Sequence, residues 1–263
     1  MKSNLLFYIF LFFSFLYSSA LVANSICFVT AENGLIIREN PSISSKVLGK
    51  FEFGTRIHLS DETEQYVDTL LIAGKQRIGY WVKISTHTFS CYATEDQKEG
   101  FVFNIFLDDE QTFVAKIQEG FSKFTQLKDY QLDTENDIFC LKGDFLGDKI
   151  TDTAILLKRK EQNQEGYYDK NIVILNYNAT SKEPKVTFLS KEDGYEWVGV
   201  FVKINAGTPL WSNYDEDWID FDKVLEKDKV LLTYDCFLLH AAEACGGNFT
   251  FWKDNKFNYL QQE

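Results

Sequence analysis

The chain has 263 residues, 16% of them aromatic, and a formal net charge of −12. This length allows one large domain or two modest ones, each with its own hydrophobic core, and the abundance of aromatic residues favours packed β-structure. The negative charge argues against nucleic-acid binding, because the neutralisation of phosphates requires a basic surface. The same charge repels anionic membranes but is compatible with cationic or neutral ligands.

The first residues have the pattern of a secretory signal. Lys2 precedes an apolar run from Leu5 to Tyr17, and Ser18-Ser19-Ala20 supplies small residues for cleavage. We therefore expect residues 1–23 to be a signal peptide. The mature protein is then secreted, periplasmic or part of the cell envelope, with no membrane span after cleavage. The alternative is an uncleaved anchor, because the apolar segment approaches the length that crosses a bilayer.

Residues 34–59 carry the most informative motif in the chain. The positions that make up this motif are Gly34, Leu35, Arg38, Pro41, Ser42, Ser45, Val47, Leu48, Gly49, Gly54 and Thr55. This pattern resembles the opening of the bacterial SH3-like (SH3b) domain. Residues 79–84, with Trp81, and residues 99–103 are similar to the later strands of that family. The resemblance implies an SH3-like β-barrel over residues 26–107 that binds cell-wall peptide or an envelope protein.

Five residues are candidates for the ligand groove of this barrel: Arg38, Asn40, Tyr80, Trp81 and Phe101. Their aromatic rings would offer flat apolar surfaces, and their polar groups would orient a peptide or glycan. The alternative is that Trp81 and Phe101 belong to the barrel core, because alternation buries half of every strand. Tyr80 and Trp81 then point to opposite faces, and Tyr80 is the better exposed candidate.

The remainder of the chain predicts a second β-rich domain. Residues 108–135 read as a linker helix, because apolar residues recur every three or four positions over residues 111–128. Short β-type segments fill residues 136–263, and Asp254-Asn255-Lys256 predicts a turn in a final hairpin. The expected fold is therefore mainly β, an SH3-like barrel followed by an antiparallel β-rich (α+β) domain.

Export would permit disulfides, and the chain has five cysteines. We expect one bridge between Cys27 and Cys91 and a second between Cys236 and Cys245. Cys140 would remain as a buried free thiol.

Residues 143–152 combine glycines with acidic residues at Asp144, Asp148 and Asp152. Carboxylates spaced in this way can surround a hard cation such as Ca²⁺, and the segment resembles the calcium loop of FG-GAP and integrin-like repeats. Leu146 replaces one ligand of that motif. The alternative is a turn between two strands in which the carboxylates accept hydrogen bonds from backbone N–H groups.

No catalytic residues are predicted, and we expect no cofactor unless calcium binds. The preferred interpretation is a non-catalytic binding or adaptor protein of the cell envelope. Two alternatives remain, a calcium-stabilised adhesion-type module and an envelope hydrolase. The hydrolase would use Cys245 as nucleophile and His240 as base, which are close in sequence.

Overall fold

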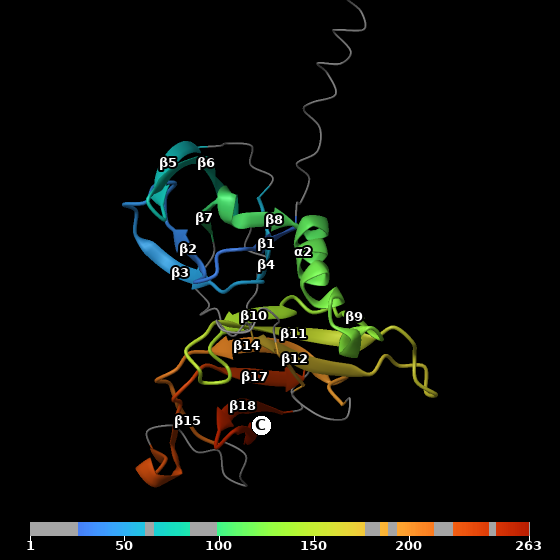
Figure 1. Ribbon diagram of the computed structural model, residues 1–263. Helices are drawn as coiled ribbons and strands as arrows, with labels where there is room; N and C mark the ends of the chain where they lie inside the picture. The colour runs from blue at the N-terminus through green and yellow to red at the C-terminus, as the bar shows by residue number, and fades with distance from the viewer. Residues whose placement is uncertain are drawn as a thin grey trace, which may run out of the picture.

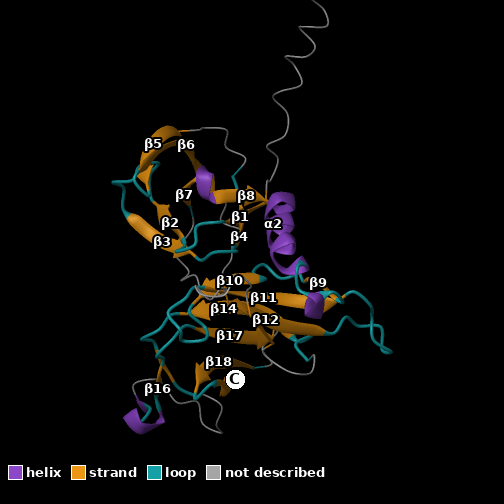
Figure 2. Ribbon diagram, in the orientation of Figure 1, coloured by secondary structure: helices purple, strands orange, loops and turns teal. Residues whose placement is uncertain are grey.

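The computed structural model describes residues 26–60, 66–84, 99–176, 185–188, 194–212, 223–241 and 246–262. The structure is mostly β, as expected, with several antiparallel sheets. Figures 1 and 2 show an N-terminal unit, drawn in blue and green in Figure 1, above a second unit built largely of strands. The predicted signal peptide lies outside the described residues. Within the described residues, no helix is long and apolar enough to cross a membrane.

The N-terminal unit contains two antiparallel sheets, one with the strand order β3-β2-β7-β6-β5 and one with the order β4-β1-β8. Apolar side chains from both sheets, including Val29, Leu35, Ile57 and Val102, form a shared core. A 3-10 helix, η1 (Asn104–Phe106), connects the last two strands. The strands are β1 (Ile26–Val29), β2 (Leu35–Arg38), β3 (Val47–Phe51), β4 (Arg56–His58), β5 (Tyr66–Ile72), β6 (Lys75–Ile84), β7 (Gly100–Phe103) and β8 (Leu107–Asp109).

The β5–β6 hairpin has a two-residue turn, Ala73-Gly74, between the paired residues Ile72 and Lys75. Ala73 has φ 48° and Gly74 has φ 74°. Two consecutive residues in the left-handed region match the twist of the flanking strands, and a glycine adopts this conformation without a steric penalty. The turn therefore fixes the register of a long hairpin at the edge of the five-stranded sheet.

The helix expected at residues 111–128 is present but shorter. Helix α2 spans Glu110–Ser122, and the Asp109 carboxylate caps it by accepting a hydrogen bond from the backbone N–H of Thr112 at 2.9 Å. Gly120 lowers helix propensity in the last turn. A 3-10 helix, η2 (Thr125–Leu127), and strand β9 (Tyr130–Leu132) follow, and β9 pairs with β11 of the second unit.

Two antiparallel sheets form most of the second unit. One has the order β10-β11-β12-β13 with β9 attached, and the other has the order β14-β17-β18-β19. A two-stranded ribbon, β15–β16, and a 3-10 helix, η4 (Glu226–Asp228), lie beside them. The strands are β10 (Cys140–Gly143), β11 (Asp152–Arg159), β12 (Lys170–Asn176), β13 (Lys185–Phe188), β14 (Val198–Ile204), β15 (Pro209–Leu210), β16 (Val230–Leu231), β17 (Cys236–Ala241), β18 (Gly247–Lys253) and β19 (Lys256–Gln262).

The expected final hairpin is present as β18–β19. Its turn residues Asp254 and Asn255 have φ 53° and 59°, which is the conformation of a tight hairpin turn. Strands β11 and β12 are buried along most of their length. They form the centre of a core that includes Phe139, Phe201 and Phe237.

The largest hydrophobic core includes residues of both units. Phe28 of β1 stacks on Phe113 of α2, with ring centroids 4.8 Å apart, and Phe113 lies 5.8 Å from Phe139 of the second unit. Gly54 also packs so closely that a Cβ at this position would overlap the carbonyl oxygen of Cys140. Helix α2 is therefore part of a packed junction.

Candidate functional site

A groove of about 360 Å³ lies on the N-terminal unit, where β2 and β5 flank β7 and β6 in the five-stranded sheet. Trp81 and Phe103 are its most buried aromatic residues, and their rings lie 5.3 Å apart. Exposed apolar side chains surround them. They are Ile36 of β2, Ile43 of the β2–β3 loop and Leu71 of β5.

The polar groups of the groove are few. Arg38 lines it and donates a hydrogen bond from Nη1 to the carbonyl oxygen of Ser45 at 2.8 Å, which fixes the side chain against the β2–β3 loop. Glu32 and Asn33 contribute from the β1–β2 turn. A mainly apolar groove with a few oriented polar groups can hold an extended chain with apolar side chains.

The structure brings only part of the sequence-predicted site together. Arg38 and Trp81 line the groove, whereas Asn40, Tyr80 and Phe101 do not. Tyr80 points away because side chains alternate along β6. The half-buried Phe101 packs against Tyr66, with ring centroids 5.8 Å apart.

Sequence reasoning missed most of the groove. Its remaining apolar lining comes from Ala31, Leu35, Ile36, Ile43, Leu70, Leu71, Ile72, Phe103 and Phe106. Alternation offered one signal, because Leu35 and Ile37 belong to the core, which leaves Ile36 on the other face of β2. Short sequence patterns do not predict the curvature of the sheet that brings β2 and β5 to the same groove.

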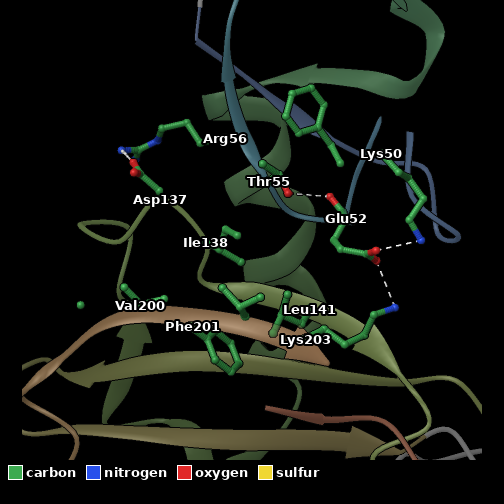
Figure 3. A pocket seen from close by; sticks show the side chains of 13 residues that line it. Lys50, Glu52, Thr55, Arg56, Asp137, Ile138, Leu141, Val200, Phe201 and Lys203 are labelled. Atoms are coloured by element: carbon green, nitrogen blue, oxygen red, sulfur yellow. Dashed lines mark hydrogen bonds and ion pairs between the residues drawn. The ribbon is translucent and has the colours of Figure 1, made fainter. Parts of the chain in front are cut away.

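A second cavity, of about 120 Å³, lies between the two units (Figure 3). Its walls come from the β3–β4 segment, from residues 137–141 and from β14. Apolar side chains make up part of its lining, among them Ile138, Leu141 and Val200. The sequence could not indicate this cavity. Its lining residues extend from Lys50 to Lys203, about 150 positions along the chain, and they come together only when the two units pack against each other.

Ion pairs border this cavity on two sides (Figure 3). Glu52 pairs with Lys50 at 2.8 Å and with Lys203 at 3.0 Å, and Arg56 lies 3.5 Å from Asp137. Burial opposes the ionisation of Glu52, but hydrogen bonds and charges from the two lysines outweigh it and lower the pKa of this carboxyl. Glu52 is therefore a carboxylate at neutral pH.

The acidic loop at residues 143–152 forms a compact turn between β10 and β11. Asp144 accepts hydrogen bonds from the backbone N–H groups of Gly147 and Lys149, and Asp148 accepts one from Ile150. Asn176 Nδ2 donates a hydrogen bond to Asp148 and another to Asp152. The backbone N–H groups of Phe145 and Leu146 donate to the other carboxylate oxygen of Asp152. All six carboxylate oxygens of the three aspartates thus accept hydrogen bonds.

Calcium binding by this loop stays a hypothesis. Across the part of the chain that the structure describes, no group of three or more His, Cys, Asp or Glu residues is arranged to hold a metal ion. Burial, together with the charge of Asp148, raises the pKa of Asp152 to about 6, although its hydrogen bonds favour the ionised form.

The disulfide and hydrolase hypotheses fall partly on residues that are not described, because Cys91 and Cys245 lie outside the described ranges. Cys27, Cys140 and Cys236 are buried, and no disulfide joins these three described cysteines to one another. Burial raises the pKa of Cys140 and Cys236 to about 12, so both thiols are protonated at neutral pH. His240 Nδ1 lies 2.7 Å from the carbonyl oxygen of Ala241. Both disulfides remain predictions.

Comparison with known families agrees with this architecture. Residues 33–108 match the family model of the bacterial SH3 domain. The N-terminal unit therefore contains a bacterial SH3 domain, as the motif at residues 34–59 predicted. Domains of this class commonly bind cell-wall peptidoglycan or proteins and often occur in envelope-associated proteins. The matched range includes β2 to β7 and all but the last residue of β8, whereas β1, α2 and the second unit lie outside it. No curated protein and no solved structure matches the chain.

Proposed function

We propose that this protein is an exported, non-catalytic binding protein of the cell envelope. Its SH3 domain holds an extended segment of cell-wall peptide in the groove between β2 and β5. The observation that carries the proposal is the position of this apolar groove within the matched bacterial SH3 domain.

Burial within the groove supports an extended ligand. Trp81 and Phe103 are almost fully buried, so they form a rigid base, whereas Ile43 is 57% exposed and Leu71 is 72% exposed. Exposed apolar side chains in one groove are typical of an interaction surface. A ligand that covers them removes apolar area from water without any rearrangement of the base.

Hydrogen bonding supports a peptide rather than a purely apolar ligand. The Arg38 guanidinium has five N–H donors, and one hydrogen bond to Ser45 holds it beside the groove. Its other donors can bind the carbonyl or carboxylate groups of a peptide. The overall charge of −12 does not exclude such a ligand, because the binding surface itself is mainly apolar.

The test is retention of the protein by purified, insoluble peptidoglycan, with two matched variants. Ile43→Asp places a charge in the groove, whereas Val47→Asp changes a residue of β3 that is 51% exposed and does not line the groove. Because both positions are exposed, both variants should fold. We expect the parent and Val47→Asp to sediment with peptidoglycan and Ile43→Asp to remain in the supernatant.

Two results would overturn the proposal. If the parent is not retained, the groove does not bind cell-wall peptide, and an envelope protein becomes the better candidate for its ligand. If Ile43→Asp is retained as well as Val47→Asp, peptidoglycan binds at another surface.

A further inference from the structure

We propose that the cavity between the two units binds a small carboxylate with a short apolar body. The inference is independent of the groove, because the linings of the two sites share no residue. It rests on three observations: the size of the cavity, the apolar residues of its lining, and hydrogen-bond donors in that lining that lack acceptors.

The size and walls of the cavity suit a small apolar group. Its volume is about 120 Å³, and an apolar protein cavity of about 150 Å³ is large enough to hold benzene. Ile138, Leu141 and Val200 are aliphatic residues of its lining (Figure 3). A branched chain of about four carbons would fill such a space and remove these side chains from water.

The donors of the lining require an acceptor. The Lys203 side chain is only 9% exposed, and its ammonium has one acceptor in the described chain, Glu52 at 3.0 Å. An ammonium carries three donors, and a charge that is removed from water requires compensating partners. On the other side of the cavity, Arg56 Nε is buried without a hydrogen-bond partner among the described residues.

The acceptors of the lining are already engaged. Glu52 has both carboxylate oxygens bound by lysines, and Asp137 faces the Arg56 guanidinium. A carboxylate is the strongest small acceptor for a buried ammonium, because both partners of the hydrogen bond are charged. A ligand with its carboxylate at Lys203 would accept hydrogen bonds from the ammonium, and its apolar body would pack between Ile138 and Val200.

Isovalerate is a suitable probe, and isovaleramide is its neutral counterpart of nearly equal size. We expect titration calorimetry of the purified chain to give a dissociation constant for isovalerate on the order of 1 mM or tighter. The amide should bind about tenfold more weakly, because it loses the charge-assisted hydrogen bond.

Two variants assign the binding to the cavity. Lys203→Met should remove the preference for isovalerate over isovaleramide. Lys229→Met is its matched control, because Lys229 is similarly buried (13% exposed) and pairs with Glu226 at 2.7 Å, while it does not line the cavity. Val200→Phe fills the cavity and should abolish binding of both probes, whereas Val67→Phe adds the same ring at an exposed site and should not.

Circular dichroism and thermal unfolding identify any variant that fails to fold. The proposal is wrong if the parent shows no binding at isovalerate concentrations well above the expected dissociation constant. It is equally wrong if folded Val200→Phe binds isovalerate as the parent does, or if folded Lys203→Met keeps the preference for the acid. These outcomes do not depend on whether the protein binds peptidoglycan, so this proposal can fail or hold independently of the proposed function.

Discussion

The indole Nε1 of Trp81 donates a hydrogen bond to Asp68 Oδ2 at 3.1 Å. The other carboxylate oxygen of Asp68 accepts a hydrogen bond from the backbone N–H of Thr69 at 2.7 Å. One side chain on β5 thus fixes the ring at the base of the groove and also binds a backbone donor of its own strand. Because β5 is an edge strand among the described strands, this contact also reduces its capacity to pair with another chain.

Replacement of Asp68 should loosen the groove. Asp68→Ala leaves the buried indole N–H without its acceptor, so we expect the free energy of unfolding to fall by about 1–3 kcal/mol. Urea unfolding followed by tryptophan fluorescence measures this loss. Asp129→Ala, at an exposed position, is the control and should change stability little. Equal stability of the two variants would contradict the role assigned to Asp68.

Asp152 should make the protein less stable as the pH rises. Its pKa is raised to about 6 in the folded protein from 3.8, so the folded state binds more protons between these values. The contribution of Asp152 is therefore fully present below about pH 4 and is lost as the pH passes about 6, by up to about 3 kcal/mol.

Asp152→Asn removes this titration. The difference in unfolding free energy between the parent and the variant should change across the same pH interval and remain constant above it. Urea unfolding at a series of pH values measures the difference. A difference that does not vary with pH would show that Asp152 titrates normally in the folded protein.

Glu52 should have the opposite pH dependence. Its pKa is lowered in the folded protein by Lys50 and Lys203 despite its burial, so its contribution is present above the unfolded pKa of 4.5 and is lost as the pH falls through the folded value. Glu52→Gln should lower stability by roughly 1–2 kcal/mol at pH 7. The same variant should match the parent closely at pH 3, and a loss of equal size at both pH values would contradict this account.

Calcium should have little effect on thermal stability. All six carboxylate oxygens of Asp144, Asp148 and Asp152 already accept hydrogen bonds from backbone N–H groups or from Asn176. A cation would have to displace several of these donors. We therefore expect the same melting temperature in calcium and in chelator, and a clear rise in calcium would support the calcium-loop hypothesis.

The two units should unfold together. Phe28, Phe113 and Phe139 form one continuous aromatic cluster across the junction. Arg56 adds a hydrogen bond to the carbonyl oxygen of Thr134 at 2.9 Å. Calorimetry should therefore show a single transition, and Phe113→Ala should lower its midpoint, with a cost of about 3–5 kcal/mol. Two separate transitions in the parent would indicate that the junction contributes little.

Local sequence patterns were sufficient to predict the SH3 domain and most strands. The glycines, the turn residues and the alternation around Leu35 and Ile37 act over a few residues, so each can be read from its neighbours. The same patterns predicted the final hairpin at Asp254 and Asn255. The length of α2 was less predictable, because helix ends depend on caps and packing as well as on periodicity.

Tertiary structure alone decided the two candidate sites. Whether Tyr80 or Trp81 faces the groove depends on which face of β6 the neighbouring strands cover, and the approach of β2 to β5 depends on the curvature of the whole sheet. The cavity exists only because Arg56 and Glu52 of one unit meet Lys203 of the other. Burial of apolar side chains from both units brings residues that are distant in sequence into contact. Local sequence patterns cannot predict such contacts between the units.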